Sequence, residues 1–348
     1  MVAFRKTASR KKRYRMYPPI TPRAFLAGSI AQETVKAGLA VPFLGGPRAF
    51  TMVQVGNEVR PARALSADQL AEFAQPRPSY RGLDLSRPVL MGVVNVTPDS
   101  FSDGGKFHKP ESAIAHGVML AEAGAAIIDV GGESTRPNAT PVDEAEEIER
   151  VFPVVSALAK GGICVSIDTR HPRVMKAALD AGAKIINDVA ALTAPGAMEI
   201  ASKGGAAVIL MHMQGTPQTM QDNPTYDWAP GDIFQFLEDR VAACIAAGIP
   251  KDRIAVDPGL GFGKTDAHNL QILDHLAMFH GLGCALAVGA SRKGFVGRIT
   301  GEKEAGSRMV GSVAAAIYAA GQGAQILRVH DVAETRQALM VSGQINGF

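Results

Sequence analysis

Eight short apolar segments recur at a regular spacing from Pro88 to the C-terminal region of the chain. Each has the length of a strand and is apolar almost throughout, which is typical of parallel strands that are covered on both faces. The segments between them are rich in Ala, Leu and Glu, and several end in Gly, as helices do. The eight apolar segments are VLMGVVNV, AAIIDVG, CVSIDT, KIINDV, AVILMHM, IAVDPG, ALAVGAS and QILRVHD.

Strands and helices that alternate in eight units predict an α/β fold, a (β/α)8 TIM barrel with an N-terminal extension. The alternative is a doubly wound open sheet, which usually has fewer strands. A dinucleotide-binding sheet of that kind also carries GxGxxG after its first strand, and the sequence has no such motif there. The barrel is therefore the preferred interpretation.

The chain divides into three parts by composition. Residues 1–17 hold seven Lys or Arg and no acid, which predicts a disordered tail, with a targeting peptide or a nucleic-acid arm as alternatives. Residues 18–87 form an extension without an assigned role, with a predicted strand at FTMVQVG and a predicted helix after Ser66, where Gln69 completes a capping box. Residues 88–348 form the barrel, and we expect the extension to pack on its N-terminal face or outer helices, far from the mouth.

Charge and cysteine content exclude several classes of protein. The net charge is +3, but seven of the 36 basic residues lie in the tail and all 33 acidic residues lie outside it. The remainder is slightly acidic, so no nucleic-acid partner is expected. No apolar run is long enough to cross a membrane. The three cysteines share no metal-binding spacing, which predicts free thiols in a reducing cytoplasm.

Polar residues stand at the end of every predicted strand. In a (β/α)8 barrel these strand ends and the loops after them form the active site. One such residue could serve as a helix cap, but a full set directed to one mouth indicates a functional site. The residues are Asn95, Asp129, Asp168, Asn187, His212, Asp257, Ser291, Arg328 and His330.

Four of the polar groups suit a heterocyclic ring. Asp168 and Asp257 offer acceptors, Asn187 offers a donor and an acceptor, and Lys293 offers a cationic donor. A carboxylate matches the paired N–H donors of a 2-amino heterocycle, so the set fits a guanine-like or pterin-like ring. Purine sites use the same groups, so this chemistry alone leaves the ring open.

A second group of residues suits an anion. Arg328 and His330 lie two residues apart and therefore on the same side of their strand. Two such donors fit a phosphate or diphosphate, and Thr135 and Arg136 in GGESTRP add a hydroxyl and another cation. Asn95 is a candidate Mg²⁺ ligand, provided that substrate phosphates and water complete the coordination.

The motifs in their order resemble one known family. NVTPDSFSDGG, DVGGESTRP, SIDT, INDV, MHMQGTPQTMQ, DPGLGFGK, GASRKGFVG and RVHDV together resemble dihydropteroate synthase, over about residues 88 to 340. The resemblance implies a pterin-binding transferase of folate biosynthesis that uses Mg²⁺ and is a target of sulfonamides. Its substrates would be 4-aminobenzoate and (7,8-dihydropterin-6-yl)methyl diphosphate, and its products 7,8-dihydropteroate and diphosphate.

The resemblance also implies a role for individual residues. Asn95 would bind the metal, and Asp168, Lys293, Arg328 and His330 would form the catalytic set. Two positions depart from the family pattern, namely Asn138, where Gly is usual, and Gly294, where Ser is common. The substrate-binding residues would be Asp168, Asn187, Asp257 and Lys293 for the pterin, Thr135, Arg328 and His330 for the diphosphate, and Phe101, Thr135, Arg136, Pro137 and Ser291 for the two loops and the 4-aminobenzoate pocket, with Met211 and Phe262 completing the set.

Two other functions share part of this pattern. A pterin-binding methyltransferase domain has the same barrel and pterin set but needs no diphosphate site, which would leave Arg328 and His330 without a purpose. A non-catalytic paralogue would bind pterins only, or bind RNA through its basic tail. For the synthase we expect loss of diphosphate to give a ring-stabilised cation, so that no strong general base is needed. We also expect a homodimer in the cytoplasm.

Overall fold

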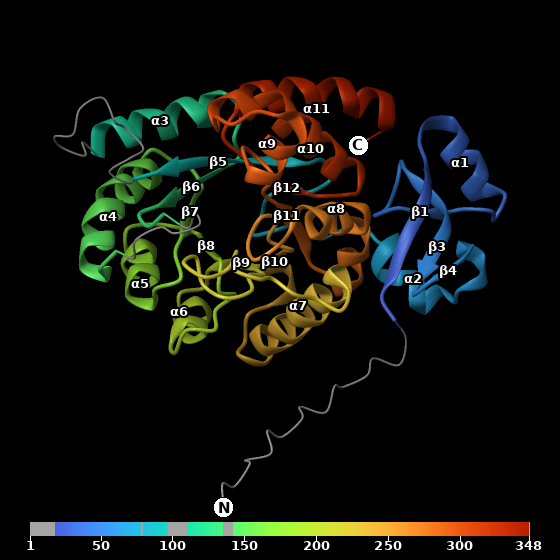
Figure 1. The fold of residues 1–348 in the computed structure, drawn as a ribbon, viewed down its shortest axis with the longest axis horizontal. Helices are drawn as coiled ribbons and strands as arrows, with labels where there is room; N and C mark the ends of the chain where they lie inside the picture. The colour runs from blue at the N-terminus through green and yellow to red at the C-terminus, as the bar shows by residue number, and fades with distance from the viewer. Residues whose placement is uncertain (1–17, 78, 97–109, 135–141, 348) are drawn as a thin grey trace, which may run out of the picture.

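A computed structural model describes residues 18–77, 79–96, 110–134 and 142–347 of the chain. Eight parallel strands close into a barrel in chain order, with the last strand paired to the first (Figure 1). Every apolar segment singled out in the sequence contains one of these strands, so the predicted (β/α)8 barrel is confirmed. The strands are β5 (Val89–Asn95), β6 (Ile127–Gly131), β7 (Val165–Asp168), β8 (Ile185–Asp188), β9 (Ala207–Met211), β10 (Ile254–Asp257), β11 (Ala285–Val288) and β12 (Ile326–Val329).

Helices alternate with the strands and surround the barrel (Figure 1). Local capping residues explain several of their starts: the Asp143 side chain accepts a hydrogen bond from the amide of Ala145, and Thr265 forms a capping box with His268. The α-helices are α3 (Pro110–Glu122), α4 (Glu144–Lys160), α5 (Pro172–Asp180), α6 (Ala197–Lys203), α7 (Ala229–Ala246), α8 (Asp266–Asp274), α9 (Gly294–Thr300), α10 (Met309–Gly321) and α11 (Val332–Asn346). Short 3-10 turns are η3 (Lys251–Arg253), η4 (Leu276–Leu282) and η5 (Gly306–Arg308).

Successive side chains of a strand point to opposite faces, so each barrel strand contributes to two cores. Ile128 and Val130 of β6 pack in the outer core, against the helices. Ile127 belongs to a separate cluster that fills the lower part of the barrel interior. Tyr80 and Leu85, which precede β5, are buried in that lower cluster and close the N-terminal end of the barrel. The lower interior is thus apolar, whereas the inward positions nearer the strand ends are polar.

The extension forms a small antiparallel sheet and two helices. The sheet runs β1–β3–β2, and β4 pairs with β3. FTMVQVG lies mostly in β3, and Ser66 and Gln69 form the predicted capping box at the start of α2, so both local predictions are confirmed. The elements are β1 (Ile20–Leu26), α1 (Gly28–Lys36), β2 (Val41–Pro42), β3 (Ala49–Val55), β4 (Glu58–Pro61), η1 (Ala62–Ala64) and α2 (Ala67–Ala74).

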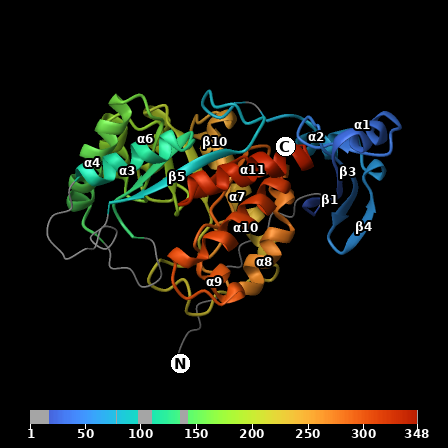
Figure 2. The ribbon, with the colours of Figure 1, turned by 90° about the horizontal axis from the view of Figure 1, so that it is seen from above.

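The extension docks on the barrel at the C-terminal ends of the outer helices. Its core, which includes Phe50 and Phe73, continues into Ala277 of η4. Arg23 binds the carboxylate of Asp274 at the end of α8, with N–O distances of 2.8 and 2.7 Å. Arg48 donates to the carbonyl of Gly321 at the end of α10. Helix C-termini lie at the barrel end opposite the strand C-termini, so the extension packs away from the mouth, as expected (Figure 2).

The role of the extension and the domain boundaries stay predictions, and residues 1–17 lie outside the described residues. Among the helices that the structure describes, none is both long enough and apolar enough to span a bilayer.

Candidate active site

The strand ends bring the predicted ring-binding residues together at the barrel mouth. Asp168 ends β7 and lies beside Asn187 of β8 in the parallel register. Asp257 ends β10, and Lys293 follows β11 as the N-cap of α9. The side chains of Asp168, Asn187 and Asp257 are all buried although they are polar. Such groups are retained at this depth only when they pair with one another or with a ligand.

Arg328 is the centre of the network inside the mouth. Its Nε donates to Oδ2 of Asp129 over 2.7 Å, and its Nη2 donates to Oδ2 of Asp168 over 2.8 Å. Burial opposes the charge of the guanidinium, but the two carboxylates outweigh it and raise the pKa of Arg328 above its ordinary value. Arg328, which is predicted to bind the diphosphate, therefore also holds two acids of the mouth in place.

Asp129 is a member of this network that the sequence indicated only as a polar strand end. Its side chain is completely buried, and its Oδ2 accepts from Asn187 Nδ2 over 3.0 Å as well as from Arg328. The signal for it was its position at the end of AAIIDVG, which resembles that of the other strand-end residues. Its partners lie 58 and 199 residues away in the chain, so no local pattern could assign them.

Asp168 keeps one oxygen available for a ligand. No described residue donates a hydrogen bond to its Oδ1, although that atom is buried. Burial raises the pKa of Asp168 to about 7, while Arg328 acts in the opposite direction. The carboxyl group therefore changes charge near neutral pH, and a ligand that donates an N–H would find a buried acceptor.

Lys293 lies among the acids and over an aromatic ring. Its Nζ is 3.9 Å from the centroid of the Phe262 ring, a cation–π distance. Burial and the nearby Arg328 lower the pKa of Lys293 to about 7, although Asp257 and Asp168 act in the opposite direction. Burial also raises the pKa of Asp257, whose Oδ1 accepts from the amide of Gly259 over 2.7 Å. Protons can thus redistribute within this group when a ligand enters.

Lys264 joins two loops beneath Phe262. Its buried Nζ donates to the carbonyl oxygens of Phe262 and His212, over 2.8 and 3.2 Å, and lies 3.1 Å from His212 Nδ1. Burial lowers the pKa of His212 to about 2, so this histidine is neutral. Gly259 has a φ of +69°, and a Cβ atom there would lie 2.0 Å from the His212 carbonyl oxygen. His212 therefore has a structural role. Lys264 connects it to the backbone of Phe262, which is a predicted substrate-binding residue.

Two of the three residues predicted for diphosphate, Arg328 and His330, have different partners. His330 lies just beyond β12, where its Nδ1 is 3.0 Å from Ser291 Oγ and its amide donates to the same oxygen over 3.2 Å. Arg328 instead contacts Asp129 and Asp168. The pair Ser291–His330 therefore links the end of β12 to the loop after β11.

Several predicted residues lie at the edge of the described structure or beyond it. Asn95 ends β5 and is half-buried. The described residues contain no group of three or more His, Cys, Asp or Glu side chains that could hold a metal. Gly294 begins α9, and Met211 ends β9. Phe101, Thr135, Arg136, Pro137 and Asn138 lie outside the described residues.

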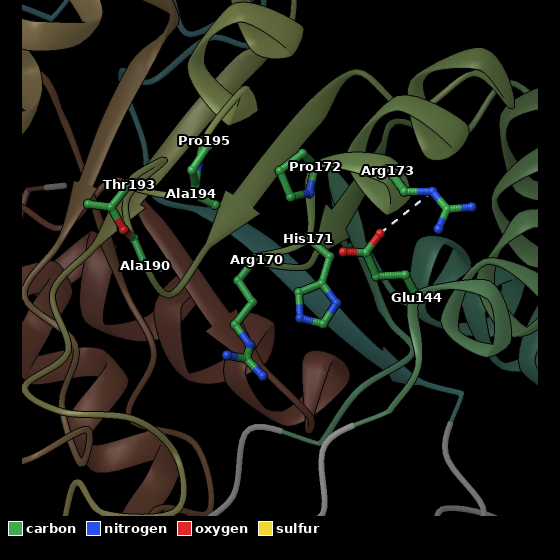
Figure 3. Close-up of a pocket in the computed structure, with 9 residues that line it drawn as sticks. All are labelled: Glu144, Arg170, His171, Pro172, Arg173, Ala190, Thr193, Ala194 and Pro195. Atoms are coloured by element: carbon green, nitrogen blue, oxygen red, sulfur yellow. Dashed lines mark hydrogen bonds and ion pairs between the residues drawn. The ribbon is translucent and has the colours of Figure 1, made fainter.

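A pocket of about 580 Å³ lies beside the mouth, after β7 and β8 (Figure 3). It is lined by residues 170–173, which end the loop after β7 and begin α5, by residues of the loop 190–195 and by Glu144 at the start of α4. Its cations are matched by acids: Arg170 pairs with Glu133 over 3.1 Å, and Arg173 lies 3.7 Å from Glu144. None of the predicted ring-binding residues lines this pocket, so the candidate site is the cluster around Arg328.

Comparison with known proteins identifies the family. A family described as "Pterin binding enzyme" matches residues 91–330. The chain belongs to the pterin-binding enzyme family. The dihydropteroate synthase of Escherichia coli strain K12 is 48% identical over 262 residues, which cover 74% of this chain and 92% of that protein. The resemblance seen in the sequence motifs is therefore confirmed.

Solved structures of the pterin-binding family agree in fold. A Yersinia pestis dihydropteroate synthase, described with a sulfonamide drug complex, has a TM-score of 0.74 and 48% identity, covering 78% of this chain and 99% of that chain. A dihydropteroate synthase from Xanthomonas albilineans, in complex with 7,8-dihydropteroate, has a TM-score of 0.71 and 44% identity, covering 78% and 100% of the two chains. The match to the family begins at residue 91, so the sheet of β1 to β4 lies outside it.

Replacing Lys293 with Met removes the buried amine at similar side-chain length. Loss of a charged hydrogen bond of about 1.5–3 kcal/mol predicts that the Kd of 6-hydroxymethylpterin at pH 6 rises about tenfold to a hundredfold. Because the pKa of Lys293 is lowered to about 7, the wild-type protein loses the ammonium between pH 6 and pH 9, and its pterin affinity should fall over that interval. Lys293→Met should lack this component of the pH dependence.

Calorimetric titrations at pH 6 and pH 9 measure this effect. Titration of the pterin itself affects the wild type and Lys293→Met equally, so it cancels when the two proteins are compared. Lys184→Met is the control, because Lys184 is exposed and stands just before β8, at the closed end of the barrel. If Lys293→Met and Lys184→Met bind the pterin alike, Lys293 lies outside the pterin site.

Proposed function

We infer that this protein catalyses the dihydropteroate synthase reaction, a transferase step of folate biosynthesis. It joins 4-aminobenzoate to (7,8-dihydropterin-6-yl)methyl diphosphate and releases diphosphate. The observation that carries this inference is the cluster of Asp168, Asn187, Asp257, Lys293 and Arg328 at the mouth of a barrel whose relatives are dihydropteroate synthases.

The ring of the pterin binds between Asp168, Asp257 and Lys293. Asp257 and Asp168 accept hydrogen bonds from N–H groups of the ring, for which Asp168 Oδ1 is available among the described residues. Asn187 provides the acceptor Oδ1, because its Nδ2 already donates to Asp129. Lys293 donates to the ring carbonyl or a ring nitrogen. Met211 at the end of β9 is level with Asp257, and Phe262 in the loop after β10 lies against Lys293. This arrangement matches donor to acceptor around the ring.

The diphosphate binds to Arg328 and His330, with Thr135 adding a hydroxyl. Arg328 uses Nε and Nη2 to bind Asp129 and Asp168, so its other N–H groups can bind an anion. His330 is held by Ser291, which sets the direction of its ring. Phe101, Arg136, Pro137 and Ser291 form the 4-aminobenzoate pocket in this proposal.

Bond cleavage precedes attack in the proposed reaction. The C–O bond between the pterin methylene and the diphosphate breaks, and its electron pair leaves with the diphosphate, which Arg328 and His330 stabilise. The positive charge left on the methylene spreads over the electron-rich dihydropterin ring, close to Asp168. The nitrogen of 4-aminobenzoate then forms the new C–N bond and releases its proton to solvent. No strong general base is required, since an aromatic amine attacks a cation without prior deprotonation.

Asn95 fits a metal ion that is shared with the substrate. It ends β5 at the mouth and offers one neutral amide oxygen, and the described residues provide no acidic cluster around it. Mg²⁺ commonly binds through one or two protein oxygens together with phosphates and water, so Asn95 with a diphosphate is a suitable donor set. A bound Mg²⁺ would supply charge neutralisation for the leaving diphosphate.

The protein is further proposed to be a homodimer that forms through α10 and α11. These two helices pack against each other and expose Val310, Met340, Val341 and Ile345, each more than half accessible. Large apolar side chains gathered on neighbouring helices mark protein interfaces more often than free surface. Light scattering should give twice the monomer mass of 36.5 kDa, and Val341→Glu should shift the mass toward the monomer.

The location in the cell stays a prediction. The three cysteines, Cys164, Cys244 and Cys284, are free thiols in the structure. Free thiols are common in reducing compartments, and we therefore propose a cytoplasmic location, which immunoblotting of cell fractions tests.

The activity is tested with both substrates and Mg²⁺. The wild-type protein should release one diphosphate for each dihydropteroate formed, as measured by a coupled diphosphate assay and by chromatography, and a sulfonamide should compete with 4-aminobenzoate. Asp168→Asn preserves shape and removes the charge, so kcat should fall by more than the pterin affinity. Asp180→Asn at the end of α5 is the control, because its exposed carboxylate pairs with Lys176 on the surface.

The other outcomes distinguish the alternatives. Pterin binding without any diphosphate release would favour a non-catalytic paralogue. Methyl transfer from a methylated pterin, with no reaction of the diphosphate substrate, would favour the methyltransferase domain.

Mg²⁺ should bind together with diphosphate rather than alone. Because one amide oxygen holds Mg²⁺ weakly, titration of Mg²⁺ into the free protein should give no saturable heat at micromolar concentrations. Titration in the presence of pyrophosphate should give saturable binding, and Asn95→Ala should weaken it. Asn346→Ala, at the end of α11, is the control. Tight binding of Mg²⁺ to the protein without pyrophosphate would contradict the shared site.

A further inference from the structure

Asp129 lies deeper in the barrel than the residues assigned to the substrates. In the parallel register it is level with Val93 of β5 and Ser166 of β7, whereas Gly131, two positions further along β6, is level with Asp168. Asp129 therefore occupies the inward position below the ring of groups at the mouth. Its side chain is completely buried.

One oxygen of this carboxylate serves two residues that are assigned to different parts of the substrate. Oδ2 accepts from Arg328 Nε over 2.7 Å and from Asn187 Nδ2 over 3.0 Å. Arg328 belongs to the diphosphate contacts and Asn187 to the ring contacts. Asp129 is thus the shared support of two groups that come from β12 and β8, on different sides of the barrel.

The contact with Asn187 decides which way its amide faces. An ionised carboxylate has only acceptors, so the NH₂ end of the amide must face Asp129 and the oxygen end must face elsewhere. Without a carboxylate at this place, both orientations of the amide would be accessible. A flipped amide would present a second donor to the ring in place of an acceptor, and ring N–H groups would lose their partner.

The contact with Arg328 decides how the guanidinium lies. Asp129 binds the Nε edge from below, and Asp168 binds Nη2 nearer the mouth. Carboxylates bound to two different nitrogens of a planar guanidinium restrict how its plane can lie. Asp129 is the deeper of the two, with 0% of its side chain exposed against 10% for Asp168, so water and substrate compete less for it.

We propose that Asp129 is a positioning residue that orients Asn187 and Arg328 together, so that one buried carboxylate aligns the ring-binding and diphosphate-binding parts of the site. The proposal rests on the proposed function, since it takes the roles of Asn187 and Arg328 from it. In this proposal Asp129 acts through Asn187 and Arg328.

Asp129→Asn tests the proposal, because it retains the shape and removes the charge. The KM for the pterin diphosphate should rise at least about tenfold, as for the loss of a charge-assisted hydrogen bond, whereas the KM for 4-aminobenzoate should stay within about twofold. In binding experiments, the Kd of 6-hydroxymethylpterin and the Kd of pyrophosphate should both rise. A residue that served only the fold would lower Tm and would not separate the two KM values.

Ser166→Ala is the matched control. Ser166 is the neighbour of Asp129 in the register of β6 and β7, it is equally buried, and no described residue bonds to its Oγ. It should leave both KM values unchanged. Asp129→Ser, which keeps a neutral acceptor in a smaller side chain, is the second variant if Asp129→Asn lacks a cooperative thermal transition.

Each outcome bears on the proposal. A folded Asp129→Asn protein with the kinetics of Ser166→Ala would overturn it, and so would an equal rise of both KM values. If neither variant of Asp129 folds, the residue determines the fold and the proposal is wrong. Absence of dihydropteroate formation by the wild-type protein would instead overturn the proposed function, which is a separate result.

Discussion

The ion pairs of Arg328 with Asp129 and Asp168 are the interaction on which the rest of the mouth depends. A guanidinium inside a barrel would be costly without partners, and so would each carboxylate. The three groups solve this problem jointly, and their contacts link β12 to β6 and β7 across the interior. The closure of the barrel, in which β12 pairs with β5, brings these strands within reach of one another.

Burial in the mouth determines the electrostatic state of the site. Asp168 and Lys293 both have a pKa of about 7, one raised and the other lowered, since burial penalises either charge. A site of this kind can adjust its protonation to an incoming ring at little cost. In the proposed function, the acids that bind the ring are also those closest to the methylene cation formed when diphosphate leaves. Binding and chemistry thus use one set of groups.

The polar mouth and the apolar part of the barrel interior lie at opposite ends of the barrel. Its lower interior is apolar and closed by Tyr80 and Leu85, and the extension docks at the same end through Arg23, Arg48 and an aromatic core. The added sheet therefore contacts helix ends rather than strand ends. The candidate site and the extension therefore lie at opposite ends of the barrel, and the extension precedes the family match.

The sequence by itself determined the elements and the composition of the mouth. Apolar runs of strand length, polar residues at their ends and the capping box at Ser66 depend on local pattern, which secondary structure follows closely. The local pattern does not determine which polar groups bind one another. The Arg328–Asp129 and Arg328–Asp168 pairs span 199 and 160 residues, and Ser291 meets His330 across 39. Only closure of the barrel decides such distances, which is why Asp129 could be recognised as a strand-end acid but not as the support of Arg328 and Asn187. The docking of the extension was decided in the same way, by complementary surfaces formed from distant parts of the chain.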